Sequence, residues 1–270
     1  MPGAFCANRT GTGSINPCEA AKGVKGGLVM EWDVFAVILA AGTSSRMGRP
    51  KQLLDWGGVP LLEAVIRKVL NHPFSEVIAV TGYRGEEIQR VIPIDEDRFR
   101  WVMNDRYAAG QSTSLLAGID AGKGRSAMIF LGDLPLLEDE TIRRIADTGL
   151  SKLRLHEPSL PLVVRPSFRG VPGHPVFLGN CRAMDWSSLK GGEGARGLLC
   201  HVPNRTLLAV EDPGIVMDID TPWAYESLRR IAFPPHGGGN RFSQPSSRVR
   251  LGCPRESGRE ASCDILKGEQ

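Results

Sequence analysis

The apolar positions in the first half of the chain fall into short runs separated by stretches with helical spacing. Four of these runs predict strands, at 34–41, 76–81, 100–104 and 127–131. Short runs rich in β-branched residues are typical of strands that a parallel sheet buries on both faces. Between them, apolar residues three and four positions apart predict helices at 61–70, 86–91, 114–121 and 138–148. This alternation predicts an α/β fold with a mostly parallel central sheet and helices on both of its faces.

The second half of the chain follows the same pattern less regularly. Its apolar runs predict strands at 160–164, 176–178, 207–210 and 215–219. Short helices are expected at 181–186 and 195–200. A last helix is expected from Pro222 to Ile231, because Thr221 is a good N-cap and proline is favoured at the first helical position.

The two ends of the chain lack a usable period. Residues 1–29 are rich in Gly, Ala, Asn and Thr, and residues 233–270 are rich in Pro, Gly, Ser and Arg. Such stretches bury too little apolar surface to fold, so we expect both to be disordered. The predicted folded domain is therefore 30–232, and we expect Met30 to be the functional start of the protein.

Charge and cysteine content narrow the functional classes. The 270 residues carry a net charge of +3, but each end carries +2, which leaves −1 for residues 30–232. A nucleic-acid footprint on the folded part is therefore not expected. The six cysteines show no Cys-x-x-Cys spacing, which favours reduced thiols in a cytoplasmic protein. No apolar run approaches the ~18 residues of a membrane span, and the N-terminus lacks the apolar region of a signal peptide.

The polar stretch after the first predicted strand is typical of a phosphate site. It runs from Gly42 to Lys51 and contains three cations, Arg46, Arg49 and Lys51. Small residues let backbone N–H groups approach phosphate oxygens, and the cations neutralise the remaining charge. The spacing fits neither a Walker loop nor a Gly-x-Gly-x-x-Gly fingerprint. The residues alone thus predict an anion-binding loop, with a solvated strand-to-helix connection as the alternative.

Two aspartates stand at the ends of predicted strands. Asp133 follows the run at 127–131, and Asp220 follows the run at 215–219. A carboxylate at the carboxyl end of a central strand points into the ligand crevice of an open sheet. Together with the loop, the two predict a Mg²⁺ site completed by nucleotide phosphates and water. Asp218 would lie on the same sheet face as Asp220 and could share or support the metal. The alternative is that each aspartate belongs to a proline-containing turn without a ligand.

Several motifs together resemble a known family. They are Leu39–Lys51, Asn104 with Gly110–Gly118, Gly132–Pro135, Gly170–Pro175, Gly194–Arg196 and Asp218–Pro222. The first is similar to the loop of nucleotidyltransferases that activate sugars, alcohols and pterins with a nucleoside triphosphate. The Gly-His-Pro, Gly-Ala-Arg and Asp-Ile-Asp-Thr-Pro segments narrow the resemblance to the molybdenum cofactor cytidylyltransferases. The resemblance covers roughly residues 35–229.

This resemblance implies a Rossmann-like nucleotidyltransferase fold and a specific reaction. A CMP group would pass from CTP to the terminal phosphate of molybdopterin, and pyrophosphate would leave. Mg²⁺ would be the cofactor, and a molybdoenzyme apoprotein or its chaperone would be a protein partner; neither nucleic acid nor a membrane is expected. The form Leu-Ala-Ala-Gly at 39–42 goes with cytosine, whereas guanine-using relatives tend to Leu-Ala-Gly-Gly.

The resemblance also implies roles for individual residues. Arg46 and Lys51 would hold the triphosphate and the leaving group, and Asp133 and Asp220 would hold the metal. The residues implied in nucleotide contacts, besides Arg46 and Lys51, are Leu39, Ala40, Ala41, Gly42, Thr43, Ser44, Thr113, Ser114 and Gly132. His174 and Arg196 would face the pterin. The acceptor phosphate is already anionic, so the reaction needs positioning and charge neutralisation and no general base.

Several positions depart from the family pattern on the acceptor side, among them Val171 and Pro172, where the family frequently carries cations. The family commonly carries an Asp at the position of Gly192 and acidic residues at the positions of Trp223 and Ala224. Two alternatives therefore stay open. One is a nucleotidyltransferase with another phosphate acceptor or another nucleotide, and the other is a non-catalytic accessory protein that delivers the cofactor to a molybdoenzyme.

Overall fold

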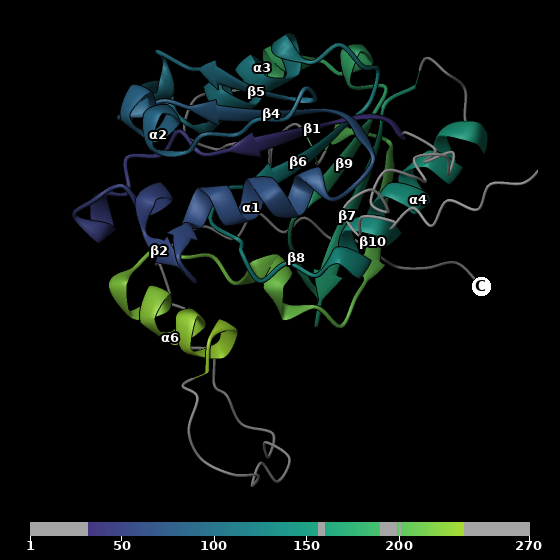
Figure 1. The fold of residues 1–270 in the computed structure, drawn as a ribbon. Coiled ribbons are helices and arrows are strands. Elements are labelled where there is room, and N and C mark those ends of the chain that lie inside the picture. The colour runs from purple at the N-terminus through teal and green to yellow at the C-terminus, as the bar shows by residue number, and fades with distance from the viewer. Residues whose placement is uncertain (1–31, 156–159, 190–198, 200, 235–270) are drawn as a thin grey trace, which may run out of the picture. The chain divides into compact units, whose positions relative to one another are not determined.

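An eight-stranded sheet lies at the centre of the computed structural model, which describes residues 32–155, 160–189, 199 and 201–234 (Figure 1). Its strands are β1 (Trp32–Leu39), β4 (Phe74–Thr81), β5 (Phe99–Met103), β6 (Ala127–Leu131), β7 (Leu162–Phe168), β8 (Val171–Pro172), β9 (Val176–Gly179) and β10 (Asn204–Ala209). Their order is β10-β7-β9-β6-β1-β4-β5, and β8 pairs with β7. A separate hairpin joins β2 (Asp55–Trp56) to β3 (Val59–Pro60).

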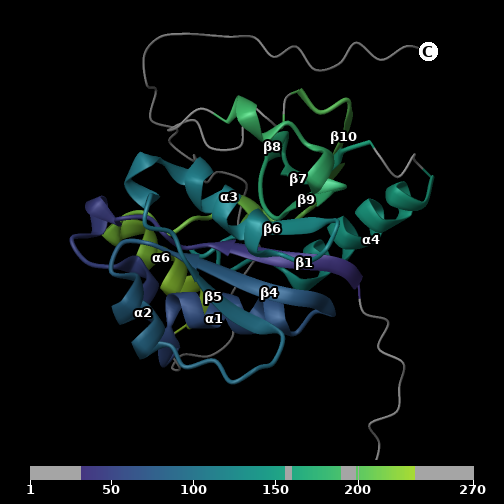
Figure 2. The same ribbon diagram turned by 90° about the horizontal axis from the view of Figure 1, so that it is seen from above.

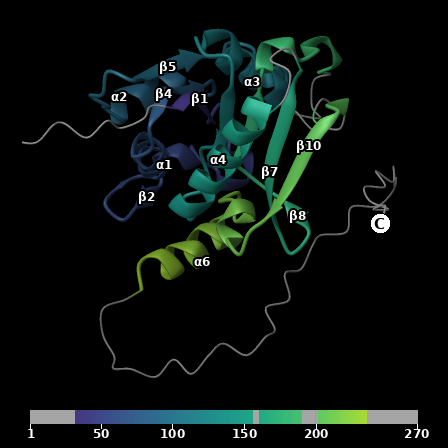
Figure 3. The same ribbon diagram turned by 90° about the vertical axis from the view of Figure 1, so that its right-hand side faces the viewer.

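The sheet is parallel where the first half of the chain builds it. Strand β1 lies between β4 and β6 and is parallel to both, and β5 extends the parallel set beyond β4. Strand β9 enters antiparallel between β6 and β7, and β10 pairs in parallel with β7 at the edge (Figure 3). The predicted mostly parallel sheet is confirmed, with the antiparallel pairs confined to its second half.

Helices cover both faces of the sheet, as the alternation predicts. The described α-helices are α1 (Leu61–Leu70), α2 (Gly85–Val91), α3 (Gln111–Ala121), α4 (Asp139–Leu155) and α6 (Pro222–Ala232), of which α6 packs in a separate small core that includes Trp56. Helices α1 and α3 lie on opposite sides of β1 and β4 (Figure 2). Within the described ranges, none of the helices has the length and apolar content needed to cross a bilayer.

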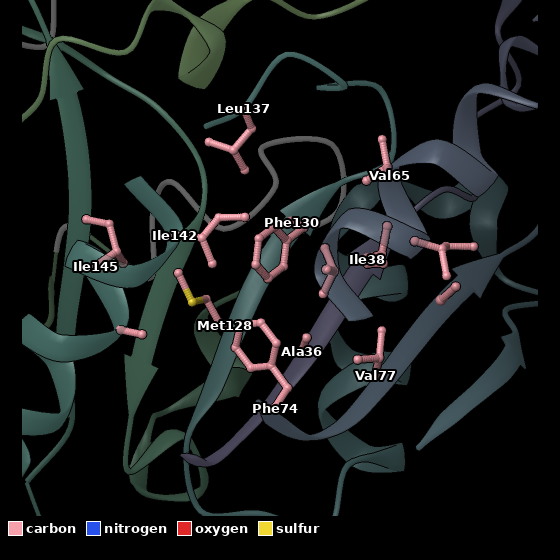
Figure 4. Packing of buried hydrophobic residues seen from close by; sticks show 14 of the residues in the cluster. Ala36, Ile38, Val65, Phe74, Val77, Met128, Phe130, Leu137, Ile142 and Ile145 are labelled. Atoms are coloured by element: carbon pink, nitrogen blue, oxygen red, sulfur yellow. The ribbon is translucent and has the colours of Figure 1, made fainter. Parts of the chain in front are cut away.

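Strand β1 shows why its apolar run is unbroken. Ala36 and Ile38 pack with Phe130 and Ile142 in the core beneath α1 and α4 (Figure 4). Phe35 and Val37 pack in the second core, beneath α3. Successive side chains of a strand point to opposite faces, so a strand covered on both sides needs apolar residues at every position.

Two predicted elements are wrong. The helix expected at 181–186 is two 3-10 turns, Cys181–Ala183 and Trp186–Ser188, because Met184 between them is extended. The strand expected at 215–219 is a 3-10 turn, Pro213–Val216, followed by irregular chain. There the apolar Met217 and Ile219 pack against a small core beneath α6 and do not pair with a strand.

Other predictions differ only in their ends or lie outside the described residues. Helix α4 is longer than the expected 138–148, and α6 begins at Pro222 with Thr221 as its N-cap, as expected. The expected helix at 195–200 lies mostly outside the described residues. Every described element belongs to one unit that ends at Pro234. The predicted boundaries at residues 29/30 and 232/233, and the disorder of both ends, stay predictions.

Candidate active site

The loop after β1 begins while the chain is still bonded to both neighbouring strands. The Ala40 amide donates to the Val80 carbonyl at 2.9 Å, and the Gly132 amide donates to the Leu39 carbonyl at 2.9 Å. These bonds extend the pairing of β1 with β4 and β6 by one step beyond the strand. The loop is therefore anchored at the carboxyl end of the central strand, where open parallel sheets bind ligands.

Gln52 fixes the shape of this loop from inside. Its side chain is nearly inaccessible, and its Nε2 donates to the carbonyl oxygens of Ala40 at 2.8 Å and Gly42 at 3.2 Å. The Lys51 amide in turn donates to Ser44 Oγ at 3.1 Å. The sequence reasoning missed Gln52, since glutamine is mostly exposed in proteins. Its place directly after Lys51 in the loop motif was the only available signal.

Lys51 joins two carboxylates that lie far apart in the sequence. Its Nζ donates to Asp133 Oδ2 and, at 2.5 Å, to Asp220 Oδ1. Arg46 reaches the other oxygen of Asp220 at 2.5 Å, but its side chain is 66% exposed, against 15% for Lys51. The site therefore contains one sheltered cation between two acids and one exposed cation at its rim.

Three aspartates form a cluster around this lysine. One carboxylate oxygen from each of Asp133, Asp218 and Asp220 lies within 4.8 Å of the others. Asp133 Oδ1 is buried and receives no hydrogen bond from any described residue. A buried oxygen without a donor is costly unless a cation or water satisfies it. Hard carboxylate oxygens gathered in this way suit Mg²⁺ or Mn²⁺, so the residues fit a divalent cation.

The electrostatics of the cluster follow from this geometry. Burial lowers the pKa of the Lys51 ammonium, but Asp133 and Asp220 more than offset it, and the pKa is raised. Burial alone would raise the pKa of Asp220, yet the hydrogen bond and charge of Lys51 lower it. For Asp218, burial and the neighbouring Asp220 and Asp133 raise the pKa to about 6. Lys51 is thus charged, and Asp218 takes up a proton more readily than Asp220.

A pocket of about 210 Å³ opens beside the lysine. Its lining residues are Leu39, Ala40, Ala41, Gly42, Lys51, Gln52, Tyr107, Gln111, Ser114, Leu131, Gly132 and Asp133. The structure thus brings together most of the residues that the sequence predicts for nucleotide binding. Thr43, Ser44, Arg46 and Thr113 are not part of this lining. Tyr107 and Gln111 are part of it, although the sequence reasoning assigned them no role.

Asn104 connects this pocket to the start of α3. Its Nδ2 donates to Thr113 Oγ1 and Ser114 Oγ, both at 2.9 Å, and its Oδ1 accepts from the Arg106 amide at 3.0 Å. The Thr113 hydroxyl donates to the Gly110 carbonyl at 2.8 Å. Thr113 is therefore engaged in holding the turn, while Ser114 faces the pocket.

Of the two residues predicted to face the acceptor, the structure describes His174 but not Arg196. His174 lies in the turn between β8 and β9, where its Nδ1 is 3.4 Å from the Ile129 carbonyl oxygen. Burial and then the nearby charge of Arg165 lower the pKa of His174 to about 4, and the hydrogen bond with the Ile129 carbonyl offsets only part of this. Arg196 and Gly192 lie outside the described residues. The assignment of His174 and Arg196 to the acceptor therefore stays a prediction.

Comparison with known proteins identifies relatives of several activities. Over 189 residues the chain is 31% identical to "Molybdenum cofactor cytidylyltransferase" of Escherichia coli K12, and the matched region covers 70% of this chain and 92% of the relative. It is 29% identical over 196 residues to "Nicotine blue oxidoreductase" of Paenarthrobacter nicotinovorans, with the same coverages.

Two of the solved structures with the same fold come from mycobacteria. A homologue of Rv0371c from Mycobacterium sp. strain JC1 matches with a TM-score of 0.63 and 23% identity, over 75% of this chain and 98% of the other. Rv0371c of Mycobacterium tuberculosis in complex with manganese matches with a TM-score of 0.56 and 23% identity, over 73% and 98%. Identities this low support the fold alone. The family model described as "MobA-like NTP transferase domain" matches residues 36–206, and the chain therefore belongs to the MobA-like NTP transferase family.

Proposed function

We propose that this protein transfers a CMP group from CTP to the phosphate of molybdopterin and releases pyrophosphate. The observation that carries the proposal is the Lys51 ammonium, which binds Asp133 and Asp220 beside a pocket lined by residues 39–42. A triphosphate in this pocket would meet the sheltered cation and the carboxylates at its reactive end. The similarity to the E. coli cytidylyltransferase supports the choice of CTP and molybdopterin.

The chain's own residues would act by positioning and charge. In the proposed reaction an oxygen of the acceptor phosphate forms a bond to the α-phosphorus, and the bond to the bridging oxygen breaks. Pyrophosphate leaves with the electron pair, and no proton has to be removed from the acceptor. Lys51 and Arg46 would neutralise the charge that develops on the leaving group. Gly42 leaves open space for the nucleotide, because a Cβ at this position would have no atom within 4 Å.

A divalent cation would be held by Asp133 and Asp220, with Asp218 as a third ligand or as support. When bound, the cation would neutralise phosphate oxygens and polarise the reacting phosphoryl group. The unsatisfied Asp133 Oδ1 and the clustered carboxylates support this assignment. The manganese complex of Rv0371c supports a divalent cation in a protein of the same fold.

The test is pyrophosphate release measured with CTP and with GTP, each with and without molybdopterin. We expect release only when CTP and molybdopterin are both present. Lys51→Ala should lower the rate on the order of 10²-fold or more, because it removes a preorganised charge at the leaving group. Lys123→Ala, an exposed lysine after α3, is the matched control and should keep the wild-type rate. A Lys51→Ala turnover within threefold of wild type would refute the role of the lysine.

A second candidate function follows from Trp223. This side chain is 79% exposed. It lies three residues after Asp220, at a position where the family resemblance leads us to expect an acidic residue. Such a change at the rim favours nucleotidyl transfer to a different phosphate acceptor. Pyrophosphate release with a panel of sugar, alditol and pterin phosphates would identify that acceptor. A protein that binds CTP and releases no pyrophosphate with any of them would instead be an accessory protein.

A further inference from the structure

Two segments carry the three clustered aspartates. The β6 segment, residues 131–138, carries Asp133, and the late segment, residues 212–220, carries Asp218 and Asp220. The β6 segment continues a central strand, whereas the late segment has a 3-10 turn and then irregular chain. Without a strand ladder, the place of the late segment depends on individual contacts with its neighbours.

Asp212 makes one of these contacts through a buried carboxylate. The residue is 2% exposed, and its Oδ1 accepts from the Gly214 amide at 2.7 Å. Its Oδ2 accepts from the Glu138 amide at 3.0 Å, which lies in the β6 segment. One carboxylate therefore caps a turn in its own segment and at the same time holds the other segment.

The segments approach each other closely on both sides of this bond. The Ile219 amide donates to the Asp133 carbonyl at 3.1 Å. A Cβ placed on Gly214 would lie 2.4 Å from the Leu136 carbonyl oxygen, so only glycine fits there. Lys68 donates to the carbonyls of Pro135 at 2.9 Å and Leu137 at 2.6 Å. Burial lowers the pKa of the Lys68 ammonium, and the charges of Asp139 and Asp212 oppose this shift. The buried carboxylate thus has two amide donors and a nearby cation, which offset the free-energy cost of removing it from water.

We propose that Asp212 is a positioning residue that sets the distance between Asp133 and the pair Asp218 and Asp220. The proposal rests on the cation site of the proposed function. A small divalent cation demands near-ideal ligand geometry, and groups that orient its ligands typically change its affinity 10–100-fold. Asp212 touches none of the three clustered aspartates, so it acts only through the two backbones that it joins.

The experiment compares Mn²⁺ binding by the full-length wild type and Asp212→Asn, using isothermal titration and the electron paramagnetic resonance of free Mn²⁺. The asparagine keeps the size of the side chain but turns an NH₂ group toward one of the two amides. We expect Mn²⁺ affinity to fall about tenfold or more at a temperature where thermal unfolding shows the variant to be folded. Asp139→Asn is the control, because Asp139 starts α4 beside Glu138 but contacts His72 instead of either segment. It should keep wild-type affinity.

A second pair of variants removes the same bond from its other end. Glu138→Pro removes the backbone N–H group that donates to Asp212, whereas Glu138→Ala keeps it. Proline is tolerated at the start of a helix. If Asp212→Asn does not fold, weaker Mn²⁺ binding by Glu138→Pro than by Glu138→Ala supports the proposal. Equal affinity in the folded variants overturns it, even if the unfolding temperature falls. If the wild type does not bind Mn²⁺, the cation site of the proposed function is overturned as well. If wild type and variants bind Mn²⁺ with equal affinity, only the positioning role of Asp212 is overturned.

Discussion

The β6 segment and the late segment bring their aspartates to the same place by different means. The β6 segment directly follows a strand that is fixed by regular pairing, since β6 pairs with β1 up to Leu131 and with β9 up to Ile129. The Gly132 amide then extends this pairing to the residue before Asp133. The late segment is fixed by the Asp212 carboxylate and by single backbone bonds such as Ile219 to Asp133. A carboxylate that follows a strand ladder within two residues is anchored by the many bonds of that ladder, so its place is less sensitive to any one of them.

The aspartates on the two segments also differ in their surroundings. Asp133 has 15% of its side chain exposed and shares Lys51, while its Oδ1 has no donor among the described residues. Asp220 has 30% exposed and receives both Lys51 and Arg46. Asp218 and Asp220 both belong to the late segment, whereas Asp133 is the one member of the described cluster that the β6 segment supplies. The late segment therefore has a spare carboxylate, and the β6 segment has none.

Replacing one acid on each segment should give the largest difference in pyrophosphate release between the two segments. Asp133→Asn should lower pyrophosphate release on the order of 10²-fold or more, because no neighbour can replace its buried oxygen. Asp220→Asn should cost less, about tenfold, because Asp218 is within reach of the same cation. Rates are measured at saturating CTP over a series of Mg²⁺ concentrations. An exposed α4 acid, Asp147→Asn, serves as control. A larger loss for Asp220→Asn than for Asp133→Asn would assign the main ligand to the late segment.

The same difference explains which parts of the site the sequence could predict. Strand 127–131 was predicted with its observed ends, because a short apolar run between polar stretches is a local property of the chain. The position of Asp133 at the carboxyl end of β6 followed from it. The late segment was predicted as a strand from its apolar Ile215, Met217 and Ile219, and this was wrong. Those residues are buried by contacts with Leu54, Tyr225 and other residues distant in the sequence, which local periodicity cannot reveal.

Two buried polar residues were missed for a related reason. Asp212 precedes a proline and Gln52 follows a lysine, and in both places the residue type is usually solvated. Their partners, Glu138 for Asp212 and Ala40 for Gln52, lie 74 and 12 positions away. Only the folded chain shows that these side chains replace missing backbone pairing. The loop motif itself was recognisable, because its glycine, serine and cations are consecutive in the sequence.

Gln52 offers a smaller test of how irregular chain is held. Gln52→Ala should cost about 1–2 kcal/mol of unfolding free energy, because it leaves buried carbonyls without donors. The loop would then be less well ordered, so the KM for CTP should rise by roughly tenfold with a smaller change in kcat. Gln89→Ala is the control, since Gln89 donates to Thr81 Oγ1 outside the loop. Equal KM values for the two variants would mean that the loop is preorganised by the strand ends alone.

The smallest expected effect is a change in the pH dependence of unfolding caused by His174, which lies in a turn next to the late segment. Its backbone amide donates to the Ile215 carbonyl at 3.1 Å, so the histidine turn touches the late segment directly. The folded-state pKa of its imidazole is about 4, below the ordinary 6.5, mainly because of burial and then the charge of Arg165. Only the unfolded chain takes up the proton between these values, so the stabilisation is complete above pH 6.5 and is lost as the pH falls toward 4.

Urea unfolding at pH 7.5 and pH 5 measures this loss. Wild type should lose about 1–2 kcal/mol more between these pH values than His174→Gln does, because glutamine cannot be protonated. The same His174→Gln protein separates the two roles considered for this residue. A changed pH profile of unfolding with an unchanged KM for molybdopterin would make His174 a buried structural residue, whereas a raised KM with an unchanged profile would place it at the acceptor.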